Sequence, residues 1–388
     1  ASTIQRVSQV RSKDTFEQLI NQLGFKNQLQ ALKNQVAEYS QEIATLYQQL
    51  ETKDQLPQSL YRRHPVVISG SRDKTIRIWE DGQVRVLEGH TDCVRSVAVS
   101  LKKGILVSAS QDSTIRVWSL ATAQLTQVLK GHSSWVCSVA ISSDGEWIVS
   151  GSADKTLRVW SLASKKTTQV LKGHSSGVRS VAISSKDQYI VSGSDYKTLR
   201  VWSLATGKKI RVLRGHSIRV ESVAISETDQ YIVSGSEDCT VRVWSLTSGD
   251  LIRVLQGHGD RVWSVTISSD DQFVVSGSDD KTIRVWSLTC GETIQVLTGH
   301  TGQVFSVKLS SDDKYLVSGE GYGDYSVRVW DLSTGEQIQE LRGHTSHVWS
   351  VNLIFFYYYV INPLGLFRVT VRGVCFAGPL FRLHFLFF

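Results

Sequence analysis

Hydrophobic and polar residues alternate in a pattern that repeats along residues 66–353 of this 388-residue chain. In one unit, residues 257–298, four short runs rich in β-branched and aromatic residues (VWSVTIS, QFVVSGS, TIRVWSL and TIQVLTG) are separated by Ser, Asp, Gly and Lys. Runs of this length bounded by turn-forming residues predict β-strands. Four strands in each unit of ~42 residues predict one blade of a β-propeller.

Two markers keep the units in register. A Gly-His dipeptide recurs after five steps of 42 residues and one of 44, and an aliphatic residue followed by Trp recurs with it. Both markers occur seven times. The histidines are His90, His132, His174, His216, His258, His300 and His344, and the tryptophans are Trp79, Trp118, Trp160, Trp202, Trp244, Trp286 and Trp330.

The two ends of the repeat region are complementary. Residues 66–88 supply the last three strands of a blade, and residues 347–353 match the missing first strand. Closing the ring would bury strand edges and apolar blade faces that an open array exposes. We therefore expect an all-β fold over residues 66–353, a seven-bladed β-propeller of four-stranded antiparallel blades.

The residues before the repeats have a different composition. Residues 1–60 are rich in helix-forming Gln, Glu, Lys and Leu and predict an N-terminal α-helical extension. Apolar residues at spacings of three and four over residues 29–50 predict a short coiled coil, and with it self-association or a helical partner. An amphipathic helix folded back on the body of the protein and a frayed segment are the alternatives. Residues 61–65 are interpreted as a linker.

An atypical aromatic tail follows the repeats. Residues 354–388 contain no acid, no Lys and no Ser, but eight of the twelve Phe residues. The uncharged run 348–367 has the length of a bilayer span, although it begins with the expected closing strand and Asn362, Pro363 and Gly365 interrupt it. Three interpretations stay open: membrane insertion, an apolar extension docked on the protein, and a non-native tail. We expect no membrane partner unless this tail is native.

Composition and charge narrow the class of protein further. A hydrophobic content of 41% with 20% charged residues excludes a disordered or collagen-like chain. The five cysteines form no C-x-x-C pair and no glycosylation sequon occurs, so we expect an intracellular protein, cytoplasmic in the first place and nuclear as the alternative. Seven arginines that stand two residues before the repeated tryptophans equal the net charge of +7, so we expect no nucleic-acid partner.

The repeats resemble a known family. The Gly-His dipeptide, the Ser-Gly-Ser-x-Asp turn and the closing strand with Trp are similar to WD repeats, although Trp-Asp itself occurs only at Trp330-Asp331. The resemblance implies that His, Ser, Asp and Trp of each blade form a structural hydrogen-bond tetrad and not a catalytic triad. The implied sets are His90, Asp112 and Trp118; His132, Asp154 and Trp160; His216, Asp238 and Trp244; His258, Ser276, Asp280 and Trp286; His300, Asp324 and Trp330; and His344, Asp73 and Trp79.

One blade departs from this pattern. Tyr196 stands six residues before Trp202, where the other blades have Asp. We expect this blade to lack the tetrad and to be the least stable locally.

Motifs that resemble chemical sites have structural explanations. Residues 173–177 match G-x-S-x-G but lie between strands, and the Gly-rich residues 319–323 precede no helix and account for the 44-residue step as an insertion in a turn. The chain contains no H-E-x-x-H, paired-Cys or Walker motif. We expect no metal site, no cofactor and no catalysis.

Two positions vary among otherwise similar blades, three and five residues after each Gly-His histidine. In propellers that the chain resembles, they lie at the narrower face around the channel mouth, where peptides commonly dock. Aromatic residues would form an arc on one side and arginines would occupy the other, a combination typical of binding hot spots. Arg72, which stands before the Asp of its turn, is added to the residues at these two positions. The candidate partner-binding residues are Arg72, Arg95, Trp135, Arg179, Arg219, Glu221, Arg261, Trp263, Phe305, His347 and Trp349.

These features predict a non-enzymatic scaffold or adaptor that binds proteins or peptides. A ligand would insert an apolar or cationic side chain into the arc and present acidic or phosphorylated residues to the arginines. The alternatives are that the aromatic residues only pack the channel mouth, or that binding uses the rim. The alternative function is the substrate-receptor subunit of a ubiquitin ligase or of another multiprotein complex.

Overall fold

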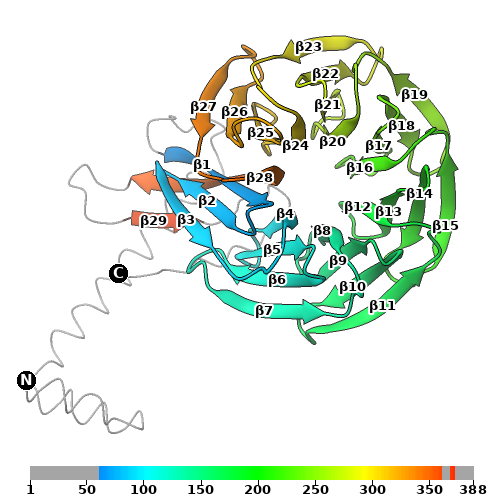
Figure 1. The fold of residues 1–388 in the computed structure, drawn as a ribbon, viewed down its shortest axis with the longest axis horizontal. Helices are drawn as coiled ribbons and strands as arrows, with labels where there is room; N and C mark the ends of the chain where they lie inside the picture. Colours follow the sequence, from blue (N-terminus) through cyan, green and yellow to red (C-terminus); the bar gives the residue numbers. More distant parts are fainter. Residues whose placement is uncertain (1–60, 361–367, 372–388) are drawn as a thin grey trace, which may run out of the picture. The chain divides into compact units, whose positions relative to one another are not determined.

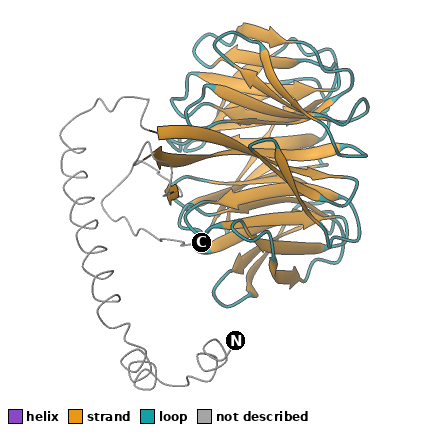
Figure 2. Ribbon diagram, turned by 90° about the vertical axis from the view of Figure 1, so that its left-hand side faces the viewer, coloured by secondary structure: helices purple, strands orange, loops and turns teal. Residues whose placement is uncertain are grey.

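The computed structural model describes residues 61–360 and 368–371, with side chains described for residues 65–355. Strands joined by short turns make up these ranges (Figure 2). No helix in the described ranges has the length and hydropathy needed to cross a bilayer. The expected helical region 1–60 with its coiled coil, and the tail residues 361–367 and 372–388, lie outside the described residues.

Seven antiparallel sheets are arranged in a ring around a central axis (Figure 1). Six have four strands, whose order in the sheet follows the chain. Blade 2 contains β4 (Val94–Ser100), β5 (Ile105–Ser110), β6 (Thr114–Ser119) and β7 (Leu125–Lys130). Blade 3 contains β8 (Val136–Ile141), β9 (Trp147–Ser152), β10 (Thr156–Ser161) and β11 (Lys166–Lys172). Blade 4 contains β12 (Val178–Ile183), β13 (Tyr189–Ser194), β14 (Thr198–Ser203) and β15 (Lys209–Arg214).

The remaining four-stranded blades continue the same order. Blade 5 contains β16 (Val220–Ile225), β17 (Tyr231–Ser236), β18 (Val241–Ser245) and β19 (Leu251–Leu255). Blade 6 contains β20 (Val262–Ile267), β21 (Phe273–Ser278), β22 (Ile283–Ser287) and β23 (Thr293–Leu297). Blade 7 contains β24 (Val304–Leu309), β25 (Tyr315–Glu320), β26 (Val327–Asp331) and β27 (Gln337–Leu341).

Blade 1 closes the ring and differs from the predicted four-stranded blade. Its order is β29-β28-β1-β2-β3, with β1 (Tyr61–Ser71), β2 (Ile76–Glu80), β3 (Gln83–Leu87), β28 (Val348–Val360) and β29 (Arg368–Val371). The predicted closure of the ring, in which the strand at residues 347–353 pairs with residues 66–88, is confirmed by the pairing of β28 with β1. Residues 61–65 belong to β1, so the linker interpretation is wrong, and β29 is a fifth strand.

The boundary predicted at residue 353 is also wrong. β28 continues to Val360 because residues 354–360 contain no Gly, Pro, Asn or Asp that would end a strand. Ile354 and Phe355 are buried, Ile354 in a cluster with Val66 and Ile68, and Phe355 6.1 Å from the ring of Tyr315 in blade 7. The first residues of the aromatic tail are therefore part of the propeller core.

Apolar side chains from neighbouring blades form the core. Trp160 of blade 3, for example, packs with Val107 and Ile115 of blade 2. The Gly of each Ser-Gly-Ser turn permits this contact, because a Cβ on Gly151 would lie 2.6 Å from the Cγ1 atom of Val178 in the next blade. Each large side chain removed from water contributes about 2–3 kcal/mol. The repeated hydrophobic positions thus fix how blades pack on one another.

Hydrogen bonds also join every blade to the next around the channel. A Ser in the first strand of one blade accepts a hydrogen bond from the backbone N–H of a Val in the first strand of its neighbour, at 3.0–3.2 Å. The seven pairs are Ser350–Val97, Ser96–Val139, Ser138–Val181, Ser180–Val223, Ser222–Val265, Ser264–Val307 and Ser306–Val351. The junction between blades 1 and 2 carries the same bond as the others, so the ring is continuous.

Candidate interaction site at the channel mouth

The tetrad connects the Gly-His loop to the strands beneath it. In blade 2, Trp118 Nε1 donates to Ser108 Oγ at 2.9 Å, the same oxygen lies 2.8 Å from His90 Nε2, and His90 Nδ1 lies 2.7 Å from Asp112 Oδ2. Thr114 donates to the other oxygen of Asp112 from both its amide and its hydroxyl. Equivalent bonds occur in blades 1, 3, 5 and 6, through His344, His132, His216 and His258.

Burial and hydrogen bonding set the protonation states of the tetrads. Burial lowers the pKa of His132, although its bond to Asp154 opposes this effect. Burial alone would raise the pKa of Asp112, but the bonds and charge of His90 and the bonds from Thr114 outweigh it and hold that pKa well below its usual value. In blades 1, 3 and 5 the tetrads therefore pair a histidine whose pKa is lowered with a carboxylate whose pKa is also lowered, which is a structural arrangement.

In blade 7 the predicted tetrad member is wrong. His300 Nδ1 lies 2.8 Å from Glu320 Oε2, and Asp324 instead binds Arg328 and Arg342, at 3.1 Å each. In blades 2, 3, 5 and 6 the Asp follows its His by 22 residues, whereas the insertion places Asp324 two residues later. The longer side chain of Glu320, from the preceding strand, reaches the histidine in its place.

Blade 4 lacks the acidic member, as predicted, but keeps the other three. Trp202 Nε1 donates to Ser192 Oγ at 2.9 Å, and Ser192 Oγ lies 2.7 Å from His174 Nε2. His174 Nδ1 is buried without a partner. Burial, together with the charge of Arg200, lowers the pKa of His174 to about 3. Whether this blade is the least stable remains a prediction.

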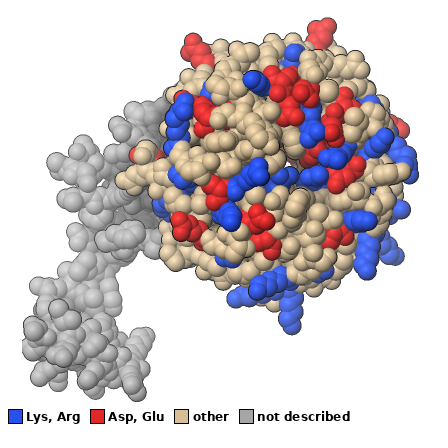
Figure 3. Space-filling model, viewed as in Figure 1, with Lys and Arg blue, Asp and Glu red and all other residues tan. Residues whose placement is uncertain are grey.

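The variable positions meet at one end of the channel. Backbone bonds from turn residues to the Gly-His loops, such as Gln111 N to Cys93 O and Glu237 N to Arg219 O, place these loops and the Ser-Gly-Ser-x-Asp turns side by side. In the view along the axis (Figure 3), blue Lys and Arg surfaces flank the central opening, with red acidic surfaces beside them and an uncharged area on another side. The channel mouth thus has a charged side and an uncharged side.

The predicted aromatic arc is a packed cluster. The rings of Phe305 and Trp349 stack at 4.4 Å, and Trp263 lies 4.8 Å from Phe305 and 5.6 Å from Trp349. Phe305 is only 5% exposed and His347 only 3%. Neither offers a surface to a partner, whereas Trp263 and Trp349 are half-buried.

Two further aromatic residues, Tyr322 and Tyr325, complete this cluster and were not predicted. Tyr322 lies 4.0 Å from the ring of His347 and is 60% exposed, and Tyr325 stacks on His347 at 5.7 Å. Both belong to the turn of blade 7 that carries the insertion. The two-residue insertion in this turn could have indicated these tyrosines in the sequence, because extra residues in a turn at the channel mouth cover part of the mouth.

Most arginines of the opposite side are neutralised. Arg179 lies 2.5 Å from Asp195, and Glu237 lies 2.5 Å from Arg261 and 3.4 Å from Arg219. Asp195 and Glu237 stand immediately before the tetrad position of their turns. These turn carboxylates leave little free positive charge in blades 4–6.

Glu221 lies inside this charged group. It is 8% exposed, and its Oε1 atom has no hydrogen-bond partner. Burial raises the pKa of Glu221, and the charges of Arg179, Arg261 and Arg95 oppose the rise.

A cavity of about 500 Å³ lies over blades 1 and 2. Trp135, 50% exposed, and Trp349 form part of its wall, so the structure places Trp135 here and not in the aromatic cluster. Arg72 lies in the same wall, and the Arg95 guanidinium stacks 3.7 Å over the ring of Trp349. The remaining wall residues are Lys74, Asp92, Cys93 and Gln111.

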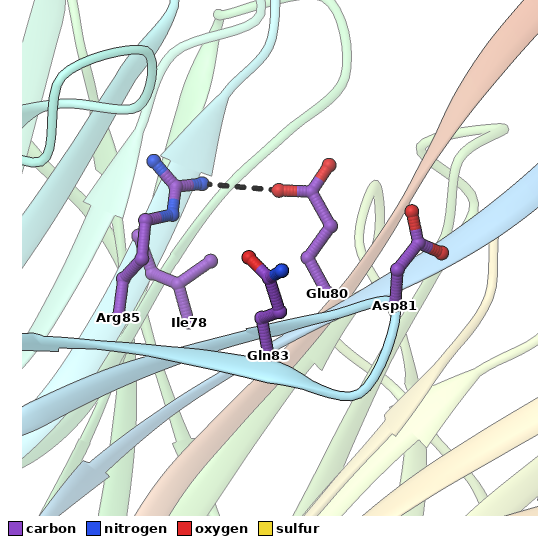
Figure 4. A pocket seen from close by; sticks show the side chains of 5 residues that line it. All are labelled: Ile78, Glu80, Asp81, Gln83 and Arg85. Atoms are coloured by element: carbon purple, nitrogen blue, oxygen red, sulfur yellow. Dashed lines mark hydrogen bonds and ion pairs between the residues drawn. The ribbon is translucent and has the colours of Figure 1, made fainter.

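A second, smaller cavity lies on the hairpin of β2 and β3. Ile78, Glu80, Asp81, Gln83 and Arg85 line about 190 Å³, and Arg85 forms an ion pair with Glu80 at 3.3 Å (Figure 4). It contains none of the candidate residues. In the part of the chain that the structure describes, no group of three His, Cys, Asp or Glu side chains is placed to hold a metal ion.

The ring of repeated blades and their tetrads define a class of protein, the seven-bladed repeat propeller. The family model described as WD40 (WD domain, G-beta repeat) matches residues 59–80, 82–119, 123–161, 165–203, 207–245, 249–287 and 291–331. The chain belongs to the WD-repeat family. No curated protein matches the chain. Propellers of this family are generally non-catalytic and are typical platforms for binding proteins or peptides.

Proposed function

We propose that this protein is a non-enzymatic scaffold or adaptor that binds protein or peptide partners at the channel mouth. The observation that carries the proposal is the contrast between constant and variable positions. Tetrads, inter-blade serines and core residues recur from blade to blade, whereas the half-buried and exposed residues around the mouth vary among the blades. A surface that serves only the scaffold would have no reason to vary in this way.

Exposed aromatic and charged side chains also favour the channel-mouth face as the binding surface. Trp135 and Tyr322 are 50% and 60% exposed, and Arg219 is exposed beside Glu237. Large aromatic and Arg side chains dominate binding energies at protein interfaces. Phe305 and His347 support this surface from below, because they are buried against the exposed rings.

Two further parts of the proposal rest on sequence. Residues 29–50 would provide self-association or a helical partner, and the protein would work inside the cell, in the cytoplasm or the nucleus. The alternative function is the substrate-receptor subunit of a ubiquitin ligase or of another multiprotein complex, which would use the same mouth for its substrate.

The test is a quantitative pull-down from native lysate with the full chain and a Tyr322→Ala, Arg219→Ala variant. Both side chains are exposed, so their loss leaves the packed rings in place. The matched control is Ile294→Ala, since Ile294 is 62% exposed on β23, the last strand of blade 6. We expect specific partners to be lost only from the mouth variant, with unchanged melting temperatures. Retention of all partners by that variant contradicts docking at the mouth.

A further inference from the structure

The cavity over blades 1 and 2 carries positive charge that is not neutralised by an ion pair. Arg72 and Lys74 are exposed in its wall, and neither side chain forms a hydrogen bond or ion pair with a described residue. Arg95 stacks on Trp349 and likewise has no ion pair there. The arginines of blades 4–6 are instead paired with Asp195 and Glu237. Free positive charge at the mouth is therefore concentrated on one side.

Nearby acidic groups do not cancel this charge. Asp92 lies in the wall, where its carboxylate accepts a hydrogen bond from the amide of Cys93 at 2.7 Å. Glu221 interacts with Arg179 and Arg261 as well as with Arg95, so its charge does not balance Arg95 alone. The two wall cations, Arg72 and Lys74, thus outnumber the one wall carboxylate, Asp92, and Arg95 adds a third cation beside the wall, on the ring of Trp349.

The other wall groups suit a side chain that ends in an anion. Trp135 and Trp349 provide flat apolar surfaces, and Trp349 Nε1 is buried without a hydrogen-bond partner. A guanidinium presents a planar fork of donors that matches phosphate oxygens, and a phosphorylated side chain carries close to two negative charges at neutral pH. The positive charge, the hydrogen-bond donors and the volume of the cavity therefore all favour a phosphorylated side chain as the ligand.

We propose that this cavity binds a phosphorylated side chain of a peptide partner, held by Arg72, Lys74 and Arg95 and flanked by Trp135 and Trp349. The proposal rests on the proposed function, since it specifies the chemistry of the peptide that docks at the mouth. A polyanion such as RNA fits less well, because ion pairs with Asp195, Glu237 and Asp279 leave the arginines on the opposite side of the opening little free positive charge for further phosphates.

The test measures fluorescence anisotropy of labelled peptide pools on the full chain. Each pool has a fixed central phosphoserine, phosphothreonine or phosphotyrosine and degenerate flanks, and matched pools carry Ser, Thr, Tyr or Glu at the centre. A ten-nucleotide single-stranded RNA is the polyanion probe. The variants are Arg72→Gln, Lys74→Gln and Arg95→Gln. The controls are Arg214→Gln, an exposed arginine at the end of β15, and Lys281→Gln, at the position in blade 6 that corresponds to Lys74.

We expect at least one phosphorylated pool to bind tenfold or more tightly than its unphosphorylated and Glu counterparts. Arg72→Gln and Arg95→Gln should each weaken that binding about tenfold, Lys74→Gln less, and the two controls not at all. Because Arg72 and Lys74 are exposed, their variants keep the test valid even if Arg95→Gln perturbs the packing on Trp349.

Three results would overturn the proposal: equal binding of phosphorylated and unphosphorylated pools, binding that Arg72→Gln and Lys74→Gln leave unchanged, or tighter binding of the RNA. These results are separate from the pull-down. If Tyr322→Ala, Arg219→Ala removes native partners while no phosphorylated pool binds, the scaffold function stands and only the phosphate site is rejected.

Discussion

His300 Nδ1 and Glu320 Oε2 lie 2.8 Å apart in a buried pair. Glu320 is the acidic partner of the tetrad histidine here, a position that an Asp occupies in blades 1, 2, 3, 5 and 6. Glu320 has no exposed surface, and its Oε1 atom also accepts from Thr301 Oγ1 and Gly302 N, at 2.6 Å each. The carboxylate therefore ties the Gly-His loop of blade 7 to β25.

Glu320→Ala should lower the free energy of unfolding by about 2–4 kcal/mol, because it leaves His300 Nδ1 and a buried amide without acceptors. Asp324→Asn is the matched control. Arg328 would retain Glu320 at 3.6 Å and Glu340 at 3.5 Å, so the loss should stay near 1 kcal/mol. Urea denaturation measures both. Equal losses in the two variants would mean that Asp324 shares the structural role.

Tyr196→Asp should stabilise blade 4. The new carboxylate would stand six residues before Trp202, where it can accept from His174 Nδ1 and from Thr198, as Asp154 does from His132 and Thr156. Satisfying this buried nitrogen should raise the free energy of unfolding by about 1–2 kcal/mol.

Hydrogen exchange of the amides in β13 and β14 checks the local effect of this substitution. We expect the wild-type amides to exchange faster than their counterparts in blades 3 and 5, and to slow down in Tyr196→Asp but not in Tyr196→Ala. Uniform exchange across the wild-type blades would contradict the prediction that blade 4 is the least stable.

Stability should fall on acidification, and His174 should contribute measurably to the fall. Its pKa is lowered in the folded state to about 3, so below its unfolded value of about 6.5 only the unfolded chain takes up this proton. The contribution is fully present at neutral pH and is lost by about 1.4 kcal/mol per pH unit as the pH falls from about 6.5 towards 3. The tetrad carboxylates, with lowered pKa values, add a further loss below about pH 4.

Urea midpoints between pH 7 and 4.5 separate the His174 contribution. His174→Gln cannot titrate, so its stability should depend less steeply on pH than that of the wild type, whatever its stability at pH 7. Parallel pH dependences would show that His174 takes up its proton equally in both states.

Ser350→Ala should destabilise the ring as much as Ser222→Ala does. Each substitution removes the acceptor of an inter-blade N–H bond, from Val97 at 3.0 Å and from Val265 at 3.1 Å, and each should cost about 1–2 kcal/mol. Thermal melting measures the losses, and exchange of the Val97 and Val265 amides locates them. A silent Ser350→Ala would mean that blades 1 and 2 are not joined in solution.

The ring could be predicted because its determinants are local and repeated. Turn residues, β-branched runs and the Gly-His register recur in every unit, so each copy supports the interpretation of the others. Even the closure through β28 followed from counting strands. The ends of the region have no such repeats, and there the prediction missed the start of β1 at Tyr61 and the continuation of β28 to Val360.

The site was harder to predict because side-chain packing across blades decides it. Spacing placed Phe305 and His347 at the mouth, but only contacts with Trp349, Tyr322 and Tyr325 show that both are buried. The count from Trp330 selected Asp324, whereas side-chain length selected Glu320. The arginines were recognised, but not the ion pairs with Asp195 and Glu237 that neutralise Arg179 and Arg261.

The hydrogen bonds that each Val amide donates to a Ser Oγ of the preceding blade run in one direction and return to their starting blade after seven steps. The ring therefore has no first or last member as far as these contacts are concerned. A gene rearranged to begin at another blade would encode the same set of donors and acceptors. Deleting one whole repeat would bring a serine and an amide from unadjacent blades together, so the number of blades is constrained by geometry and not by the chemistry of the junctions.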